Sequence, residues 1–299
     1  MDTTTYAPPV DKLLTIGKPD PTDAKDWPDY LELGLTTEHI PELLRMLTDK
    51  ELLEIDPEKP EGWAPVHAMR ALGQLRDAAV VEPLLSNSEA LMDYKTGLGE
   101  WAIDELPQVY GLIGPAAIPL LTQYLADKSQ DLYVRANAAT SLQKIATMHP
   151  EARSECIAAL TRQLEVGTEG EDDPELNAFI ITDGLIPMKA VETLPIVERA
   201  FEAHVVDESI VNLEDVQVSF GLKEREEKPP LSLKDLFGSL PSPSTPTYKP
   251  SDFTIVSPTG KPATVPSKAS KEHSAGTAAT KKAKIKMEKR SRKKNRKKN

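Results

Sequence analysis

The sequence repeats one short pattern at intervals of about 40 residues, and this repeat constrains the fold more than any other feature. In four of five copies a proline is followed, directly or after one polar residue, by two apolar residues; in the remaining copy Ala158 takes the place of the proline. Successive copies are 42, 36, 39 and 37 residues apart. Because a proline in the first turn of a helix loses no intrahelical hydrogen bond and presets φ, each copy predicts a helix start. The copies lie at Ile40–Leu44, Glu82–Leu85, Ile118–Leu121, Cys156–Leu160 and Leu194–Val197.

Another amphipathic helix is expected before each copy. In residues 64–75, for example, Val66, Met69, Leu72 and Leu75 fall on one face. We expect similar helices over residues 101–113, 132–148 and 177–188. Two helices per unit of about 40 residues are typical of an α-solenoid, and no segment keeps the two-residue alternation of a strand. The predicted fold is all-α: an α-solenoid of about five helical pairs.

Short turns are expected between the two helices of a pair. Their predicted residues are Gly73, Arg76–Asp77 and Gly114–Pro115, which are residue types that favour turns.

Several of these stretches resemble a known repeat. Residues Val134–Ile145, and Ala68–Leu75 followed by Ala78–Leu85, resemble HEAT-type repeats, in the HEAT-like variety first named from phycobilisome lyases. The match covers roughly residues 37–204. The resemblance implies a HEAT-like α-solenoid but says almost nothing about activity, because fold does not determine function.

A second resemblance concerns a family rather than the repeat alone. Trp27–Tyr30, Trp63–Pro65, Gly111–Pro119 and Asp207–Val218 resemble segments of a bacterial family of HEAT-like proteins with no assigned function.

Charge and composition divide the chain into four parts. Residues 1–28 are an irregular N-terminal lead, which Tyr6, Val10, Leu13, Leu14 and Ile16 could pin to the body. Residues 29–222, the predicted solenoid, hold 13 basic and 35 acidic residues, a net charge of −22. Residues 223–280 are rich in Pro, Ser and Thr and predict a disordered linker. Within it, Leu231–Leu240 has the spacing of a short helix that binds a partner, docks back on the body or forms only transiently.

The last part, residues 281–299, is a basic tail with 12 basic residues and one acid. It has no aromatic residue, so we expect it to bind phosphate groups without sequence preference, as in RNA or ribosomes. Anionic lipid headgroups, a nuclear address and the chain's own acidic body are the alternatives. The predicted nucleic-acid-binding residues are Lys281, Lys282, Lys284, Lys286, Lys289, Arg290, Arg292, Lys293, Lys294, Arg296, Lys297 and Lys298.

The acidic body indicates a protein partner of basic character, with a general bias towards solubility as the plain alternative. The predicted protein-binding residues are Glu100, Asp104, Glu105, Glu171, Asp172 and Asp173. The last three belong to the loop 165–173, which could also hold a cation weakly but lacks the ligand spacing of an EF-hand.

The sequence contains no motif that predicts catalysis, cofactor binding or metal binding. The five histidines lie in separate units or in the tail, and neither a nucleophile elbow nor a phosphate-binding glycine loop is present. The single cysteine, Cys156, sits among apolar residues and excludes an intrachain disulfide or a cysteine-cluster metal site. We therefore expect no catalytic residue, no cofactor and no metal.

The chain is expected to be cytoplasmic and not to insert stably into a membrane. No apolar run approaches the ~20 residues of a membrane span, and Met1–Tyr6 lacks the features of a secretory signal. The leading hypothesis is a non-enzymatic scaffold that binds a protein partner through the acidic solenoid and RNA or ribosomes through the tail. An acidic chaperone for a basic client, with the tail as an intramolecular competitor, is the alternative. A lyase-type enzyme subunit is a third, based on the fold resemblance alone. The oligomeric state is not predicted.

Overall fold

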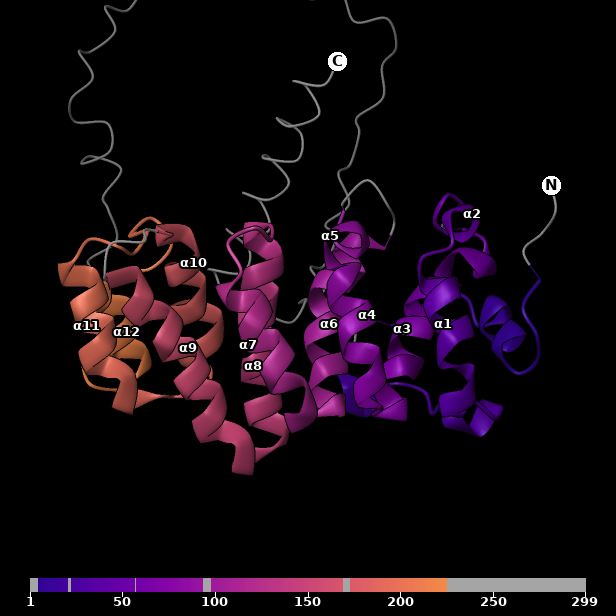
Figure 1. The fold of residues 1–299 in the computed structure, drawn as a ribbon, viewed down its shortest axis with the longest axis horizontal. Coiled ribbons are helices and arrows are strands. Elements are labelled where there is room, and N and C mark those ends of the chain that lie inside the picture. Colours follow the sequence, from indigo (N-terminus) through magenta and orange to yellow (C-terminus); the bar gives the residue numbers. More distant parts are fainter. Residues whose placement is uncertain (1–4, 21–22, 57, 94–97, 169–172, 225–299) are drawn as a thin grey trace, which may run out of the picture. The chain divides into compact units, whose positions relative to one another are not determined.

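The computed structural model describes residues 5–20, 23–56, 58–93, 98–168 and 173–224, and throughout these ranges every regular element is helical, with no strand (Figure 1). The all-α prediction is therefore confirmed for this part of the chain. The predicted basic tail, and all of the predicted linker beyond Glu224, lie outside the described residues.

The α-helices of the described part form a regular series, interrupted by shorter helical turns. They are α1 (Ile40–Leu47), α2 (Lys50–Leu53), α3 (Ala64–Leu75), α4 (Val81–Ser86), α5 (Ser88–Leu91), α6 (Gly99–Ile113), α7 (Ile118–Ala126), α8 (Leu132–Met148), α9 (Arg153–Thr168), α10 (Pro174–Phe179), α11 (Leu194–Glu202) and α12 (Leu213–Ser219). Single 3₁₀ turns are Val10–Thr15, Ala24–Asp26, Leu31–Leu33, Thr37–His39, Pro60–Trp63, Ala78–Val80, Pro115–Ala117, Pro150–Ala152 and Val191–Thr193, and Ile180–Leu185 is a π-helix.

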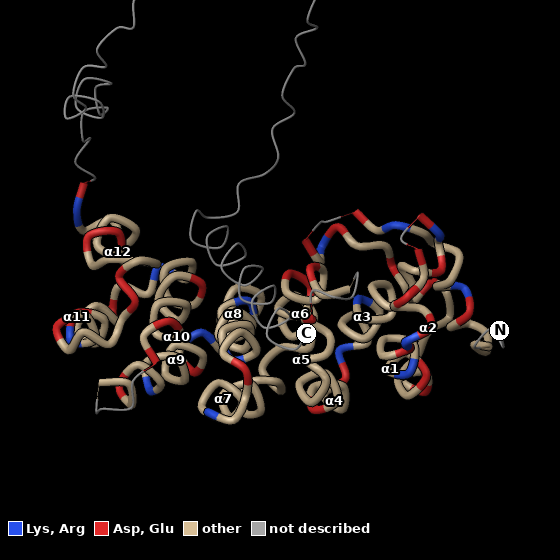
Figure 2. The backbone as a smooth tube through the Cα atoms, turned by 90° about the horizontal axis from the view of Figure 1, so that it is seen from above, with Lys and Arg blue, Asp and Glu red and all other residues tan. Residues whose placement is uncertain are grey.

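From α1 to α10, apart from the short α2 and α5, the helices alternate between two rows. Seen from above, α3, α6, α8 and α10 lie in one row, and α1, α4, α7 and α9 lie in a second row, drawn below the first (Figure 2). Neighbours within the first row pack on each other, α3 on α6, α6 on α8 and α8 on α10, and α7 and α9 pack on α8 from the second row. Each helix therefore buries its apolar stripe against helices that are close in the sequence. We call α3, α6, α8 and α10 the first helices.

The predicted helix starts agree with the structure in four of the five copies. Pro41, Pro119 and Pro195 are the second residues of α1, α7 and α11, and Pro83 is the third residue of α4. A 3₁₀ turn directly precedes each of these helices. The first helices predicted at 64–75 and 132–148 have these bounds, and the one predicted at 101–113 begins two residues earlier.

The fourth copy is aligned one helical turn too late. Helix α9 begins at Arg153, directly after the 3₁₀ turn Pro150–Ala152, so Ser154 and not Ala158 occupies the place of the proline. A shift of four residues is about one turn of an α-helix and leaves the apolar face unchanged. The hydrophobic pattern alone therefore cannot distinguish the two alignments.

Two other expectations are corrected. The chain before α1 forms 3₁₀ turns and contains the left-handed Gly34, so α1 has no full α-helix preceding it as a partner. Gly73 is not a turn residue but lies buried inside α3, where a Cβ atom would come within 3.1 Å of the Val109 Cα on α6. The turn after α3 falls at Arg76, whose φ is +54°, so the predicted turn at Arg76–Asp77 is confirmed.

The N-terminal lead is part of the core. Tyr6, Val10 and Leu13 are buried, whereas Leu14 is partly buried and Ile16 is exposed. Further along, Trp27 and Tyr30 are also buried, although the chain there forms only 3₁₀ turns and bends. Apolar side chains of an irregular segment are thus buried together with those of the N-terminal helices.

Within the described residues no single helix is both long and apolar enough to cross a membrane. Helix α6 and the segment Pro115–Ala126 together have a suitable length and composition, but they are bent by 112° relative to each other.

Gly73 and Gly111 allow a matched test of close helix packing. Gly73→Ala is expected to destabilise the fold by about 1–3 kcal/mol, because the added methyl group meets backbone of α6 that cannot move aside. Gly111→Ala is expected to cost less, because its Cβ meets Lys144 and Met148 side-chain atoms that can rotate away. Urea unfolding of both variants measures the difference; equal losses would contradict this account.

Candidate functional site

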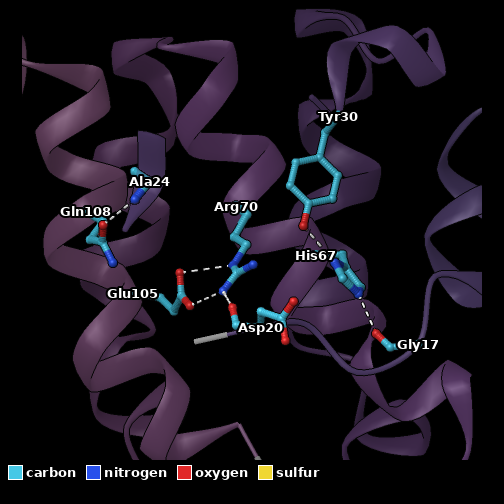
Figure 3. Close-up of polar contacts among 8 residues, drawn as sticks. All are labelled: Gly17, Asp20, Ala24, Tyr30, His67, Arg70, Glu105 and Gln108. Atoms are coloured by element: carbon cyan, nitrogen blue, oxygen red, sulfur yellow. Dashed lines mark hydrogen bonds and ion pairs between the residues drawn. The ribbon is translucent and has the colours of Figure 1, made fainter. Parts of the chain in front are cut away.

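Polar side chains of α3 and α6 converge on one irregular stretch, residues 17–20 and 23–30, which we call the N-terminal segment (Figure 3). On α3 the residues are His67, Arg70 and Gln74, whose spacing of three and seven places them on one side of the helix. On α6 they are Glu105 and Gln108. Four of these five side chains are buried, which is unusual for groups of this polarity, and Gln74 is partly buried.

The centre of this polar cluster is an ion pair between α3 and α6. Arg70 Nη2 lies 2.6 Å from Glu105 Oε1 and Arg70 Nε lies 3.1 Å from Glu105 Oε2, so the guanidinium binds both carboxylate oxygens. The two side chains are 1% and 3% exposed. Arg70 Nη2 also donates to the carbonyl oxygen of Asp20 at 2.7 Å. Burial raises the pKa of the Glu105 carboxyl, and the Arg70 guanidinium opposes that rise.

Two tryptophans enclose the Arg70 guanidinium. Its Cζ lies 4.9 Å from the ring centre of Trp27 and 5.8 Å from that of Trp101, distances at which a cation is attracted to an aromatic ring. Trp101 in turn packs edge-on against Trp63, with ring centres 5.5 Å apart. The apolar rings exclude water from the ion pair and so strengthen it.

His67 is a neutral bridge between two parts of the N-terminal segment. Its Nε2 lies 2.6 Å from the carbonyl oxygen of Gly17, and its Nδ1 lies 2.7 Å from the Tyr30 hydroxyl. A carbonyl can only accept, so Nε2 carries the proton and Nδ1 accepts from Tyr30. Burial raises the pKa of Tyr30 to about 12. Burial also lowers the pKa of His67, and the nearby Arg70 charge lowers it further.

Glutamines complete the contacts with main-chain groups. Gln108 Oε1 accepts from the backbone nitrogen of Ala24 at 2.5 Å. Gln74 accepts from the backbone nitrogen of Tyr30 and donates to the carbonyl of Pro28, both at 2.8 Å.

The N-terminal segment also reaches α8. Lys144 Nζ on that helix lies 3.4 Å from Asp23 Oδ1. The segment therefore extends from α3 across α6 as far as α8 and then returns to α3.

The side chains of the cluster are engaged in holding the N-terminal segment in place. Each nitrogen of His67, and the Nε and Nη2 of Arg70, already has a partner. The two hydrogen bonds of His67 go to Gly17 and Tyr30 and involve no serine, threonine or cysteine. Over the described residues, no group of three or more His, Cys, Asp or Glu side chains is placed to hold a metal ion. Burial raises the pKa of the Cys156 thiol to about 11, which makes it a poor nucleophile.

The structure separates the acidic residues that the sequence analysis groups together. Glu100 and Asp104 are exposed on α6, but Glu105 is buried against Arg70 and is unavailable to an outside partner. Asp173 precedes α10 and pairs with the buried Arg135 of α8 at 2.6 Å. The other predicted site residues, Glu171, Asp172 and all those of the tail, lie outside the described part of the chain.

A second feature that the sequence analysis misses is Asp183, in the π-helix after α10. Its carboxylate is partly buried, and burial raises its pKa to about 6. A hydrogen bond from the Thr182 side chain opposes that rise. Single π-helical turns are frequent at functional sites. A mid-helix aspartate followed by Gly184 is the only signal that the sequence offers.

Residues 35–235 match the model of a family described as "Protein of unknown function (DUF1186)". The chain belongs to the DUF1186 family. The matched range covers about two thirds of the chain and includes every element from the 3₁₀ turn Thr37–His39 to α12. The family description names neither HEAT-like repeats nor lyases. No curated protein and no solved structure matches the chain.

In this DUF1186 protein the buried ion pair can be tested by removing one charge or both. Glu105→Gln is expected to destabilise the fold by about 3–5 kcal/mol, because it leaves the Arg70 charge buried without a counter-ion. The double change Arg70→Met with Glu105→Leu should recover much of that loss, because no buried charge remains. Urea unfolding measures both, with the neighbouring exposed Asp104→Asn as control. A Glu105→Gln loss no larger than that of the control would refute this assignment.

The lowered pKa of His67 predicts a dependence of stability on pH. The folded protein resists protonating His67, whereas the unfolded chain protonates it near pH 6.5, so stability is present above that pH and is lost as the pH falls. The stability of the wild type should therefore fall more steeply between pH 6.5 and 5.5 than that of His67→Gln, by up to ~1.4 kcal/mol per pH unit. Parallel curves from chemical unfolding at each pH would contradict the neutral, buried state of His67.

Proposed function

We propose that this DUF1186 protein is a non-enzymatic scaffold: a HEAT-like α-solenoid that binds a protein partner, with a basic tail that tethers it to RNA. The paired helices in two rows support the solenoid, because helices packed only on near neighbours form an extended surface suited to binding. Ribosomal RNA is the most plausible target of residues 281–299, since the tail binds by charge alone.

The observation that carries the proposal is the way α3 and α6 hold the N-terminal segment. Their side chains bind main-chain groups of an irregular stretch, the carbonyls of Gly17 and Asp20 and the nitrogen of Ala24. Contacts with main-chain groups depend little on the sequence being held. A surface of first helices that holds one irregular segment of this chain is suited to hold such a segment of another protein.

Charge favours a partner of basic character. Five arginines of the body already pair with carboxylates and are not available to repel a cation. They are Arg45, Arg70, Arg135, Arg153 and Arg199. The remaining excess of exposed acids attracts basic segments and slows the approach of phosphates to the body.

The same excess of acid supports a second candidate, an acidic chaperone for a basic client. A chaperone suppresses aggregation of a basic client at stoichiometric amounts, and more strongly once the basic residues of the tail are replaced by glutamine. A scaffold without chaperone activity leaves aggregation unchanged. The third class, a lyase-type subunit, rests only on the resemblance of the repeat.

Sedimentation with ribosomes or total RNA tests the tether. The intact chain should co-sediment at 50 mM salt and dissociate as salt rises, with a slope of about −0.7 in log K against log salt for each phosphate contacted. Replacing the basic residues of 281–298 by glutamine should abolish co-sedimentation. As a control, glutamine in place of the exposed acids Glu100 and Asp104 should leave it intact. Equal co-sedimentation of the intact chain and the tail-neutralised chain would contradict the binding of RNA by the tail.

A further inference from the structure

Two tryptophans at the starts of α3 and α6 form a corner of aromatic surface. Trp63 directly precedes α3 and lies four residues before His67, so it continues the side of that helix that carries His67 and Arg70. Trp101, in the first turn of α6, meets Trp63 with ring centres 5.5 Å apart and ring planes at 73°. Trp63 is 9% exposed and Trp101 is partly exposed. We call these two rings the tryptophan corner.

The tryptophan corner already holds a cation from the N-terminal segment. Lys18 Nζ lies 5.4 Å from the ring centre of Trp63, within the distance at which an aromatic ring attracts an ammonium group. Lys18 is exposed, and a contact between a cation and a ring is weak at an exposed site. The main chain on either side is held separately, through the Gly17 carbonyl by His67 and through the Asp20 carbonyl by Arg70. Another cation can therefore replace the Lys18 side chain without displacing the N-terminal segment.

A second cation at the tryptophan corner has a structural role. Arg70 Cζ lies 5.8 Å from the ring centre of Trp101, but this guanidinium is buried and is bound to Glu105 and to the Asp20 carbonyl. The inner side of the corner is therefore filled by a fixed cation, whereas its outer side is filled by a side chain that can move.

Exposed acids flank both rings. Glu61 lies two residues before Trp63, Glu100 directly precedes Trp101, and Asp104 lies about one turn after Trp101 on α6. Their negative charge raises the local concentration of cations. The acids attract a basic segment to this end of α3 and α6, and the rings then supply a contact that only a cation makes.

We propose that the tryptophan corner receives a lysine side chain of the protein partner, which replaces Lys18 on the Trp63 ring. This inference rests on the proposed function, in which the solenoid binds a partner of basic character, and it names where one side chain of that partner is bound. The occupant is a lysine because the chain itself places a lysine ammonium on this ring.

Intrinsic fluorescence measures the occupation of the tryptophan corner directly, because the chain has three tryptophans and all of them lie in this cluster. The probe is a labelled oligolysine peptide, added to the full chain at low ionic strength. It should change the tryptophan emission in a saturable way. The same peptide with every lysine acetylated has no positive charge on its side chains and should leave the emission unchanged.

Lys18→Gln and Lys25→Gln provide a matched pair of variants. Both remove one positive charge from an exposed lysine of the N-terminal segment, and of the two it is Lys18 that lies on the Trp63 ring. Lys18→Gln should tighten peptide binding about threefold, because the peptide no longer competes with an ammonium that is already tethered there. Lys25→Gln should change the affinity little. Anisotropy of the labelled peptide measures both.

Trp101→Leu tests the ring itself. Leucine keeps an apolar side chain at this position but has no ring face that attracts an ammonium group, so peptide binding should weaken about fivefold. Circular dichroism checks that the variant is folded. If it is not, the two lysine variants test the inference without it.

The outcomes separate this inference from the proposed function. Equal tightening by Lys18→Gln and Lys25→Gln would show that the peptide responds only to overall charge, and would overturn the inference. Peptide binding that leaves the tryptophan emission unchanged would place the basic partner elsewhere on the solenoid, so that the inference fails while the proposed function stands. Absence of any binding would contradict the basic character of the partner as well. A change of emission on neutralising the tail alone would identify the chain's own tail as the occupant instead of a partner.

Discussion

The bidentate contact between Arg70 and Glu105 is the interaction on which the N-terminal half of the structure depends. It joins α3 to α6, and the same guanidinium holds the carbonyl of Asp20 and stacks near Trp27. Two charges that are almost fully buried are tolerated only because each satisfies the other. An irregular segment rich in proline can thus be held in one conformation, because its main-chain groups find fixed partners on two helices at once.

The other first helices repeat this arrangement with weaker groups. On α8, the buried Asn137 donates to the Ile103 carbonyl of α6 at 2.9 Å, and on α10 the buried Asn177 donates to the Val205 carbonyl at 2.8 Å. Each first helix therefore has a buried polar residue that reaches outside its own helix. Apolar stripes alone would let neighbouring helices slide along each other, since hydrophobic contact is not directional. The ion pair between α3 and α6 and the hydrogen bond from α8 to α6 each fix the register of neighbouring helices, whereas the bond of α10 holds the loop after α11.

The helical pairs could be predicted from the sequence because proline and apolar spacing act locally. Pro41, Pro119 and Pro195 mark helix starts through their own fixed φ, whatever the rest of the chain does. The site could not be predicted, because its contacts join residues 35 to 121 positions apart, such as Arg70 with Glu105 and Asp23 with Lys144. The prediction of a turn at Gly73 is wrong because glycine favours turns locally, whereas at this position it permits the close approach of α6. The sequence likewise does not distinguish a solvated acidic residue such as Glu100 from a buried one such as Glu105.

Buried polar groups along the row of first helices are satisfied in different ways. On α3 and α6, His67, Arg70 and Glu105 bind partners within one cluster. In the π-helix, burial raises the pKa of Asp183 to about 6, and a hydrogen bond from the Thr182 side chain opposes that rise. Because an ion pair is stronger and more directional than a bond from a neutral hydroxyl, the contacts of α3 and α6 fix the chain more firmly than those of the π-helix.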